Sequence, residues 1–256
     1  LIVIRWNYLI NLTTDKIIKY RDITGTALYS IFASELFFFG FLSRSFVSLT
    51  HNIKFSGVIS STLMEKFFSA YFMGILALLS SLICFTFTDI FFYLNNIYVY
   101  LLFIILLFSL FLPILFIQIK KIKNLNFFFN LPILKYFTYY LNWRDLYKPF
   151  IASALIQLFN FFGLLAMPFI IGININLFEY ALLLPIIIFL AAIPVSITEW
   201  GWREFVFVII LQTINLTSEE SFSIGLTTGI VYLLCTIIIL VIYEIFIRFF
   251  YFSKDS

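Results

Sequence analysis

Residues 221–243, SFSIGLTTGIVYLLCTIIILVIY, form a run of 23 residues without a charged side chain, and this run decides the class of fold. Glu220 precedes the run and Glu244 follows it. About 20 apolar residues in a helix are enough to cross the roughly 30 Å hydrocarbon layer of a membrane. We therefore predict that this run forms a transmembrane helix.

The composition extends the prediction to the whole chain of 256 residues. Apolar residues make up 63% of the sequence and charged residues 11%, with a mean hydropathy of +1.08. Soluble domains carry roughly 25% charged residues, and disordered chains have low hydrophobicity, so both classes are excluded. The net charge of +3 is too small for the basic face of a nucleic-acid-binding protein, and no nucleic-acid partner is expected.

Four further charge-free windows are also long enough to cross a membrane. They are residues 67–88, 90–119, 149–178 and 180–198. The windows between Asp22 and Glu35 and between Glu204 and Glu219 are too short, so these segments are candidate half-helices or re-entrant segments. Broken backbone is tolerated inside a membrane only where protein or a watery cavity covers it. The predicted fold is an all-α, polytopic transmembrane helix bundle with re-entrant or broken helices.

Basic residues in the loops predict the orientation, because Lys and Arg are enriched in cytoplasmic loops. Residues 119–148 contain six basic residues against one acidic residue, and we expect a cytoplasmic loop with an interfacial helix there. Alternation of the spans then places the C-terminus in the cytoplasm. We expect a single integral membrane domain over residues 1–256, a fragment that lacks an N-terminal span, because the sequence starts at Leu1 without Met.

The strongest polar constellation is residues 194–204, PVSITEWGWRE, between a span and a short window. A glycine permits a sharp break, the half-helix that follows presents unpaired N–H groups, and a guanidinium binds phosphate with two hydrogen bonds. A charge at the bilayer centre costs about 2.5–3.5 kcal/mol, so its presence suggests a use. The candidate lipid- or phosphate-binding residues are Ser196, Glu199, Gly201, Arg203 and Glu204.

The same residues allow a purely structural interpretation. Trp200 and Trp202 are typical of the aromatic belt at a membrane–water interface, where neighbouring charges are solvated. In that case Arg203 has no ligand.

The pattern Pro-x-Ser-x-x-x-x-Gly-x-Arg-Glu at 194–204, followed by a short helix, a polar turn and a last span, resembles the lysylphosphatidylglycerol synthase transmembrane region, or flippase-like domain family. Arg5-Trp6 is similar to an Arg-Trp pair at the end of an early span of that family. Glu65-Lys66 is similar to an acid–arginine pair before another span. The resemblance covers most of the chain.

The resemblance adds candidate residues in the early half of the chain. Many members carry Pro-Gly, Gly-Gly-Asp and Arg elements there, whereas this chain has ELFFFGFLSR at 35–44. Of that element, Gly40 and Arg44 match. Glu35 is a substitute for the missing acid, or else an interfacial glutamate paired with a nearby lysine. Glu35, Arg44 and Glu65 therefore join the candidate lipid-binding residues.

The resemblance implies a multi-pass protein of the cell membrane, the inner membrane in bacteria, that binds and flips an anionic or phosphate-bearing lipid. The expected partner is a phospholipid or a lipid of the polyprenyl-phosphate type. Arg203 would hold the phosphate, and Glu199 and Glu204 would orient Arg203 or carry protons. The alternative is a non-transporting scaffold subunit of a lipid- or glycan-assembly enzyme.

Catalytic function is not favoured by the sequence. It contains no nucleotide-binding or metalloprotease motif, and His51 is its only histidine. We expect no soluble aminoacyl-transfer domain, no cofactor and no metal ion.

Three small residues recur every four positions near the start of the last span: Ser221, Gly225 and Gly229. Small residues at this spacing let two membrane helices approach closely. We expect them to pack inside the protein or, alternatively, to form the face of a homodimer; an envelope-assembly protein is the other possible partner.

Overall fold

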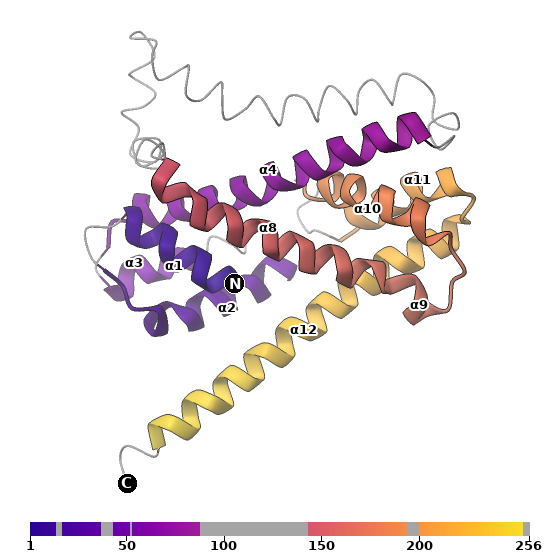
Figure 1. Ribbon diagram of the computed structural model, residues 1–256. Helices are drawn as coiled ribbons and strands as arrows, with labels where there is room; N and C mark the ends of the chain where they lie inside the picture. The colour runs from indigo at the N-terminus through magenta and orange to yellow at the C-terminus, as the bar shows by residue number, and fades with distance from the viewer. Residues whose placement is uncertain (14–16, 37–42, 52, 88–142, 194–199, 253–256) are drawn as a thin grey trace.

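A computed structural model describes residues 1–13, 17–36, 43–51, 53–87, 143–193 and 200–252 (Figure 1). The predicted all-α class is confirmed, because the elements are helical and the described part of the chain contains no strand. The helices are α1 (Ile2–Thr13), α2 (Tyr20–Leu36), α3 (Phe46–His51), α4 (Phe55–Phe87), α8 (Trp143–Leu165), α9 (Met167–Ile171), α10 (Leu177–Ala191), α11 (Trp202–Leu211) and α12 (Ser218–Phe252), with a 3-10 turn, η5 (Gln212–Ile214), after α11.

Three stretches of the described helices are long and apolar enough to cross a membrane: Phe55–Cys84 in α4, Tyr147–Ile171 in α8 and α9, and Ser218–Ile247 in α12. They cover most of three predicted windows, 67–88, 149–178 and 221–243. The window 90–119 and the greater part of the predicted interfacial loop lie outside the described residues, and α8 begins at Trp143, inside the end of that loop.

The other helices differ from the windows in instructive ways. The helix α10 begins at Leu177, just before the window 180–198, and lies mostly within it; its 15 residues span about 22 Å. This helix ends at Ala191, shortly before Pro194, and a proline disfavours helical backbone in the residue before it. The 10 residues of α11 span about 15 Å, as expected for a half-helix. Asp22 and Glu35 both lie within the single continuous helix α2.

Three hydrophobic cores of described residues lie along the length of α4, and the two larger ones belong to two different groups of helices. Figure 1 shows α1, α2 and α3 at one end of α4 and α10 and α11 at the other. The first core includes Trp6, Ile10 and Ile23, and the second includes Tyr180, Leu184 and Phe207. Because α4 contributes Val58 to the first core and Met73 and Ala77 to the second, it is the common support of both groups of helices.

The small residues of α12 pack inside the protein, against the beginning of α11. A Cβ atom added at Gly225 would lie 3.2 Å from Glu204 Cα, and one added at Gly229 would lie 2.8 Å from Arg203 Cζ. Both distances are shorter than ordinary contacts, and the neighbours at Gly225 include backbone. The two glycines therefore let α12 approach the half-helix that carries Arg203 and Glu204, as the first of the two interpretations expected.

The distal half of α12 packs against α2. A Cβ atom at Gly25 would lie 2.9 Å from the Tyr243 hydroxyl, and the Tyr29 hydroxyl donates a hydrogen bond to Glu244. Elsewhere this half of α12 exposes apolar side chains such as Ile238 and Ile242. These side chains suit a lipid environment. The contacts with α2, in contrast, hold this half of α12 against the first group of helices.

We predict that Gly225→Ala destabilises the protein by about 1–3 kcal/mol, the usual cost of overpacking a close contact, because its neighbours include the backbone of Glu204. The matched control is Gly163→Ala in α8, where an added Cβ would meet nothing within 4 Å. That control should be neutral or stabilising by up to about 1 kcal/mol, because alanine favours helix. Thermal unfolding of the detergent-solubilised variants measures both, and equal midpoints would contradict the close approach of α12 to the backbone of α11.

Candidate functional site

A buried ion pair joins α1 to α4. Arg5 lies on α1 and Glu65 about a third of the way along α4, and Arg5 Nη2 is 2.6 Å from Glu65 Oε1. Both residues are at most 5% exposed. Such a pair is costly to break, because a buried charge without its partner destabilises a protein by about 3–5 kcal/mol.

A second arginine shares the same carboxylate. Arg44 lies just before α3, and its Nη1 contacts Glu65 Oε2, the oxygen that Arg5 does not use. Its Nε donates to Ser30 Oγ of α2 at 2.9 Å, and its guanidinium carbon lies 4.9 Å from the centre of the Trp6 ring. The planar guanidinium thus has an anion at one edge and an aromatic face beside it, a position that suits arginine better than lysine.

The remaining polar contacts of Arg5 extend the cluster to α8. Its Nη1 donates to Ser69 Oγ of α4 and to Ser153 Oγ of α8, each at 2.8 Å. Ser153 Oγ in turn donates to the carbonyl of Pro149 at 2.8 Å. Glu65, the two arginines that bind it, and the Ser30 and Trp6 side chains that contact Arg44 together form a group that we name the arginine–glutamate cluster.

The charges of the arginine–glutamate cluster do not balance. Two guanidinium groups face one carboxylate, which leaves one positive charge in excess. Two further donors, Arg5 Nε and Trp6 Nε1, are buried without a hydrogen-bond partner. An unsatisfied buried donor costs about 1–3 kcal/mol. The cluster consequently favours one more acceptor oxygen, and an anionic one in particular.

A second polar cluster occupies the break before α11. Gly201 has a φ of +90°, which glycine adopts readily, and its N–H donates to Glu204 Oε2. Glu204 Oε1 accepts from Arg203 Nε at 3.1 Å and from Arg203 Nη2 at 2.8 Å. The Arg203 guanidinium also lies 5.4 Å from the Trp200 ring. Arg203 and Glu204 are both buried, so they do not belong to a solvated aromatic belt.

The two clusters differ in their charge. In the cluster before α11, Arg203 and Glu204 neutralise each other, and Glu204 also satisfies the N–H group at the helix start. These contacts fix the helix break and hold the guanidinium between the Trp200 ring and α12. Of the two buried clusters, the arginine–glutamate cluster is therefore the one with an excess positive charge.

The structure brings some predicted site residues together and leaves others apart. Arg44 and Glu65 are in direct contact, and so are Gly201, Arg203 and Glu204, in a different group. Glu35 lies near the end of α2, and nothing is described of its side chain. Ser196 and Glu199 lie outside the described residues.

Sequence reasoning omitted Arg5 from the candidate site, although Arg5 makes the ion pair with Glu65 that has the most supporting contacts. A usable signal was present, because Arg5 is a charge in an otherwise apolar stretch, next to a tryptophan. Ser30, Ser69 and Ser153 gave no signal, since single serines are common in membrane helices and the fold alone brings them to Arg5 and Arg44.

Comparison with known protein families identifies one match over most of the chain. Residues 1–239 match the family model described as the lysylphosphatidylglycerol synthase TM region. Searches of curated proteins and of solved structures found no match to this chain.

We predict that Glu65→Gln lowers the free energy of unfolding by about 3–5 kcal/mol, because both arginines lose their buried counter-charge. The control is Glu219→Gln, an isosteric change in the exposed first turn of α12, which should stay within about 0.5 kcal/mol of the wild type. Thermal unfolding in a neutral detergent compares the two. Equal stability of both variants would contradict a shared carboxylate.

Proposed function

This chain belongs to the lysylphosphatidylglycerol synthase transmembrane-region family, and we propose that it binds a phosphate-bearing anionic lipid at the arginine–glutamate cluster and carries it across the membrane. Membership of that family makes the chain a membrane protein linked to lipid handling. The identity of the lipid, the site that binds it and its movement across the membrane are proposed.

One observation carries the proposal: two buried arginines share one glutamate inside a bundle of apolar helices. Buried charges are paired in proteins, because moving an isolated charge from water into an apolar interior costs a large amount of free energy. An anionic headgroup would supply the missing negative charge. It would also accept hydrogen bonds from Arg5 Nε and Trp6 Nε1, which have no partner in the protein.

The roles of the residues follow from their chemistry. Arginine donates pairs of parallel hydrogen bonds to phosphate, so Arg5 and Arg44 are the phosphate-binding residues of the proposal. Glu65 is a positioning residue, since it holds both guanidinium groups at fixed places. It also offsets part of their positive charge, which keeps the binding of a monoanion weak enough to be reversible.

The cluster before α11 lies toward the other end of α4, and it is proposed as a second contact that the lipid phosphate makes in the course of its movement. Arg203 Nη1 takes no part in the ion pair with Glu204, because the Glu204 carboxylate accepts hydrogen bonds from Nε and Nη2. Gly201 would permit the helix break, and Ser196, Glu199 and Glu35 complete the proposed set. Release of Glu204 from Arg203 would expose one more guanidinium to a passing headgroup.

The lipid class and the cellular setting belong to the proposal as well. A phospholipid and a polyprenyl-phosphate-type lipid both offer the required phosphate oxygen. We place the protein in the bacterial inner membrane with its C-terminus in the cytoplasm, because the basic loops favour that orientation. A homodimer or an envelope-assembly partner is part of the scaffold alternative, in which the isolated chain moves no lipid.

We predict that Arg44→Gln weakens binding of an anionic phospholipid by about tenfold or more, because a hydrogen bond to a charged group contributes about 1.5–3 kcal/mol. The variant should still fold, since Arg5 and Glu65 remain paired. The control is Lys66→Gln, which neutralises an exposed cation next to Glu65. Native mass spectrometry with phosphatidylglycerol measures retention, and equal retention by Arg44→Gln and Lys66→Gln would remove Arg44 from the site.

We predict that Arg203→Gln slows the movement of a fluorescent phosphatidylglycerol across reconstituted vesicles by about tenfold, by loss of one charged hydrogen bond. Glu219→Gln should move lipid at the wild-type rate. If Arg203→Gln also moves lipid at the wild-type rate, Arg203 only fixes the helix break. Should the wild-type chain itself move no lipid and co-purify with a stoichiometric protein, the scaffold alternative is favoured instead.

A further inference from the structure

Two amide side chains lie in the middle of an apolar spanning helix. Gln157 and Asn160 belong to α8 and to the charge-free window 149–178. Asn160 follows Lys148 by 12 residues, which is about 18 Å along the helix axis, and the hydrocarbon layer of a membrane is about 30 Å thick. A polar side chain at this depth loses its hydrogen bonds to water, which is unfavourable unless other partners replace them. The two amides therefore need partners inside the membrane.

Within the described part of the chain, the two amides bond only to each other. Asn160 Nδ2 donates to Gln157 Oε1 at 3.3 Å, a long hydrogen bond within one helix. Gln157 Nε2 and Asn160 Oδ1 have no hydrogen-bond partner among the described residues. Asparagine and glutamine in membrane helices often form hydrogen bonds to another helix, which holds the two helices together. Gln157 and Asn160 do not have this role here.

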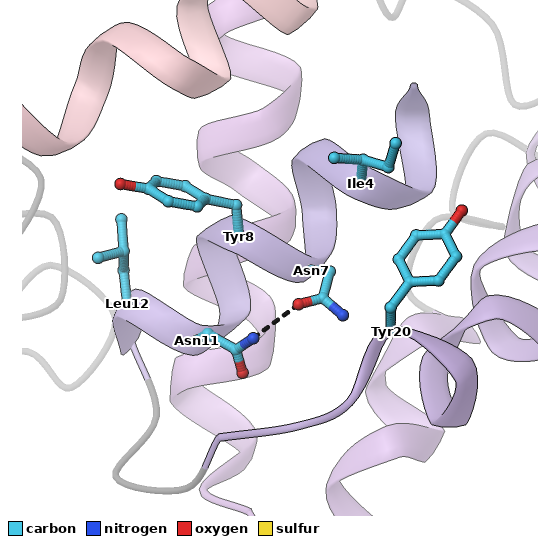
Figure 2. Close-up of a pocket in the computed structure, with 6 residues that line it drawn as sticks. All are labelled: Ile4, Asn7, Tyr8, Asn11, Leu12 and Tyr20. Atoms are coloured by element: carbon cyan, nitrogen blue, oxygen red, sulfur yellow. Dashed lines mark hydrogen bonds between the residues drawn. The ribbon is translucent and has the colours of Figure 1, made fainter.

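Two amides of α1 show what a structural role requires. Asn11 Nδ2 donates to Asn7 Oδ1 at 2.6 Å, as Figure 2 shows, and to the Ile18 carbonyl at 3.1 Å. Asn11 Oδ1 accepts a hydrogen bond from the Ile18 N–H at 2.8 Å. Asn11 thus ties α1 to the chain just before α2, and both of its polar atoms are used. The amides of α8 make no comparable contact with another described element.

The two amides lie on the buried face of α8, at a place where that face is accessible. Ser153, Gln157, Asn160 and Leu164 follow one another at intervals of four, three and four residues, which places them on one side of a helix. Ser153, Gln157 and Leu164 are buried, whereas Asn160 is only half-buried. A Cβ atom added at Gly163, in the next turn, would meet nothing within 4 Å. A ligand inside the bundle can therefore reach Asn160.

The amides also lie between the two arginine-containing clusters. One turn before them, Ser153 Oγ accepts a hydrogen bond from Arg5 at 2.8 Å. One turn after them, the Leu164 carbonyl accepts a hydrogen bond from the Tyr180 hydroxyl of α10 at 3.1 Å. The helix α10 packs against α11, which carries Arg203 in its first turn. The amides are thus an intermediate polar position on a helix that contacts both halves of the protein.

We propose that Gln157 and Asn160 bind the lipid headgroup while it passes from one of these clusters to the other. The inference rests on the proposed function, since it supplies a passage between the two phosphate contacts. Polar side chains retained inside a membrane commonly mark the path of a substrate. Amides donate and accept hydrogen bonds without carrying a charge, so they replace water around phosphate oxygens and headgroup hydroxyls but hold an anion less tightly than arginine does. Weak binding at an intermediate position favours passage over retention.

The test compares lipid movement with lipid binding in the full chain. Asn160→Leu removes the amide at similar size and should slow the movement of a fluorescent phosphatidylglycerol across reconstituted vesicles by about tenfold, the effect of one lost hydrogen bond to a charged group. The same variant should retain phosphatidylglycerol in native mass spectrometry as the wild type does, because Arg5 and Arg44 are unchanged. Asn160→Gln keeps an amide and should move lipid at close to the wild-type rate.

Two control variants separate passage from structure. Phe162→Leu changes a 64% exposed side chain of the same helix and should leave the rate of lipid movement unchanged. Asn11→Leu removes the hydrogen bonds to Asn7 and Ile18 and should lower the midpoint of thermal unfolding. Asn160→Leu should leave that midpoint unchanged.

The outcomes distinguish this inference from the proposed function. Movement of lipid by Asn160→Leu at the wild-type rate would overturn the inference and leave the proposed function standing. A midpoint lowered in Asn160→Leu as in Asn11→Leu would assign the amide a structural role, which also overturns the inference. A wild-type chain that moves no lipid would overturn the proposed function, and this inference with it.

Discussion

The sharing of one carboxylate by two arginines is the constraint on which the first half of this protein depends. Glu65 holds Arg5 of α1 and Arg44 from the segment before α3, and through them Ser30 of α2 and Ser153 of α8. Apolar helices in lipid gain little from hydrophobic association, because the lipid tails are as apolar as the side chains. A polar junction among several helices therefore fixes their relative positions, which the apolar contacts alone do not.

The second half is organised by close packing and a neutral ion pair instead. Gly225 and Gly229 bring α12 against the start of α11, and Glu204 binds both the backbone at Gly201 and the adjacent Arg203. The Glu204 carboxylate thus satisfies the N–H group of Gly201 within the protein, as a membrane setting requires. The contrast with the positively charged junction around Glu65 gives the two halves different chemistry although both contain a buried arginine.

Much of the fold could be predicted from charge spacing, because the cost of burying charge limits where spans begin and end. The windows around α4, α8 and α12 and the half-helix α11 follow from this rule. The lengths of α2 and α10 do not follow from it. Asp22 and Glu35 lie inside α2 and do not end it, and α10 ends shortly before Pro194. Arg203 and Glu204 were recognised from local sequence, whereas the pairing of Arg5 with Glu65 depends on residues 60 positions apart, which only the folded chain brings together.

Two neighbouring residues of α2 connect α12 to the buried arginines. Tyr29 binds Glu244 near the distal end of α12, and Ser30, the next residue, accepts the hydrogen bond from Arg44. One peptide bond therefore links the longest helix of the described chain to a guanidinium of the buried junction. Because α12 extends about 52 Å, a small tilt at its start becomes a larger displacement at Glu244. A tilt of α12 would therefore be felt at Arg44 through the contacts of Tyr29 and Ser30.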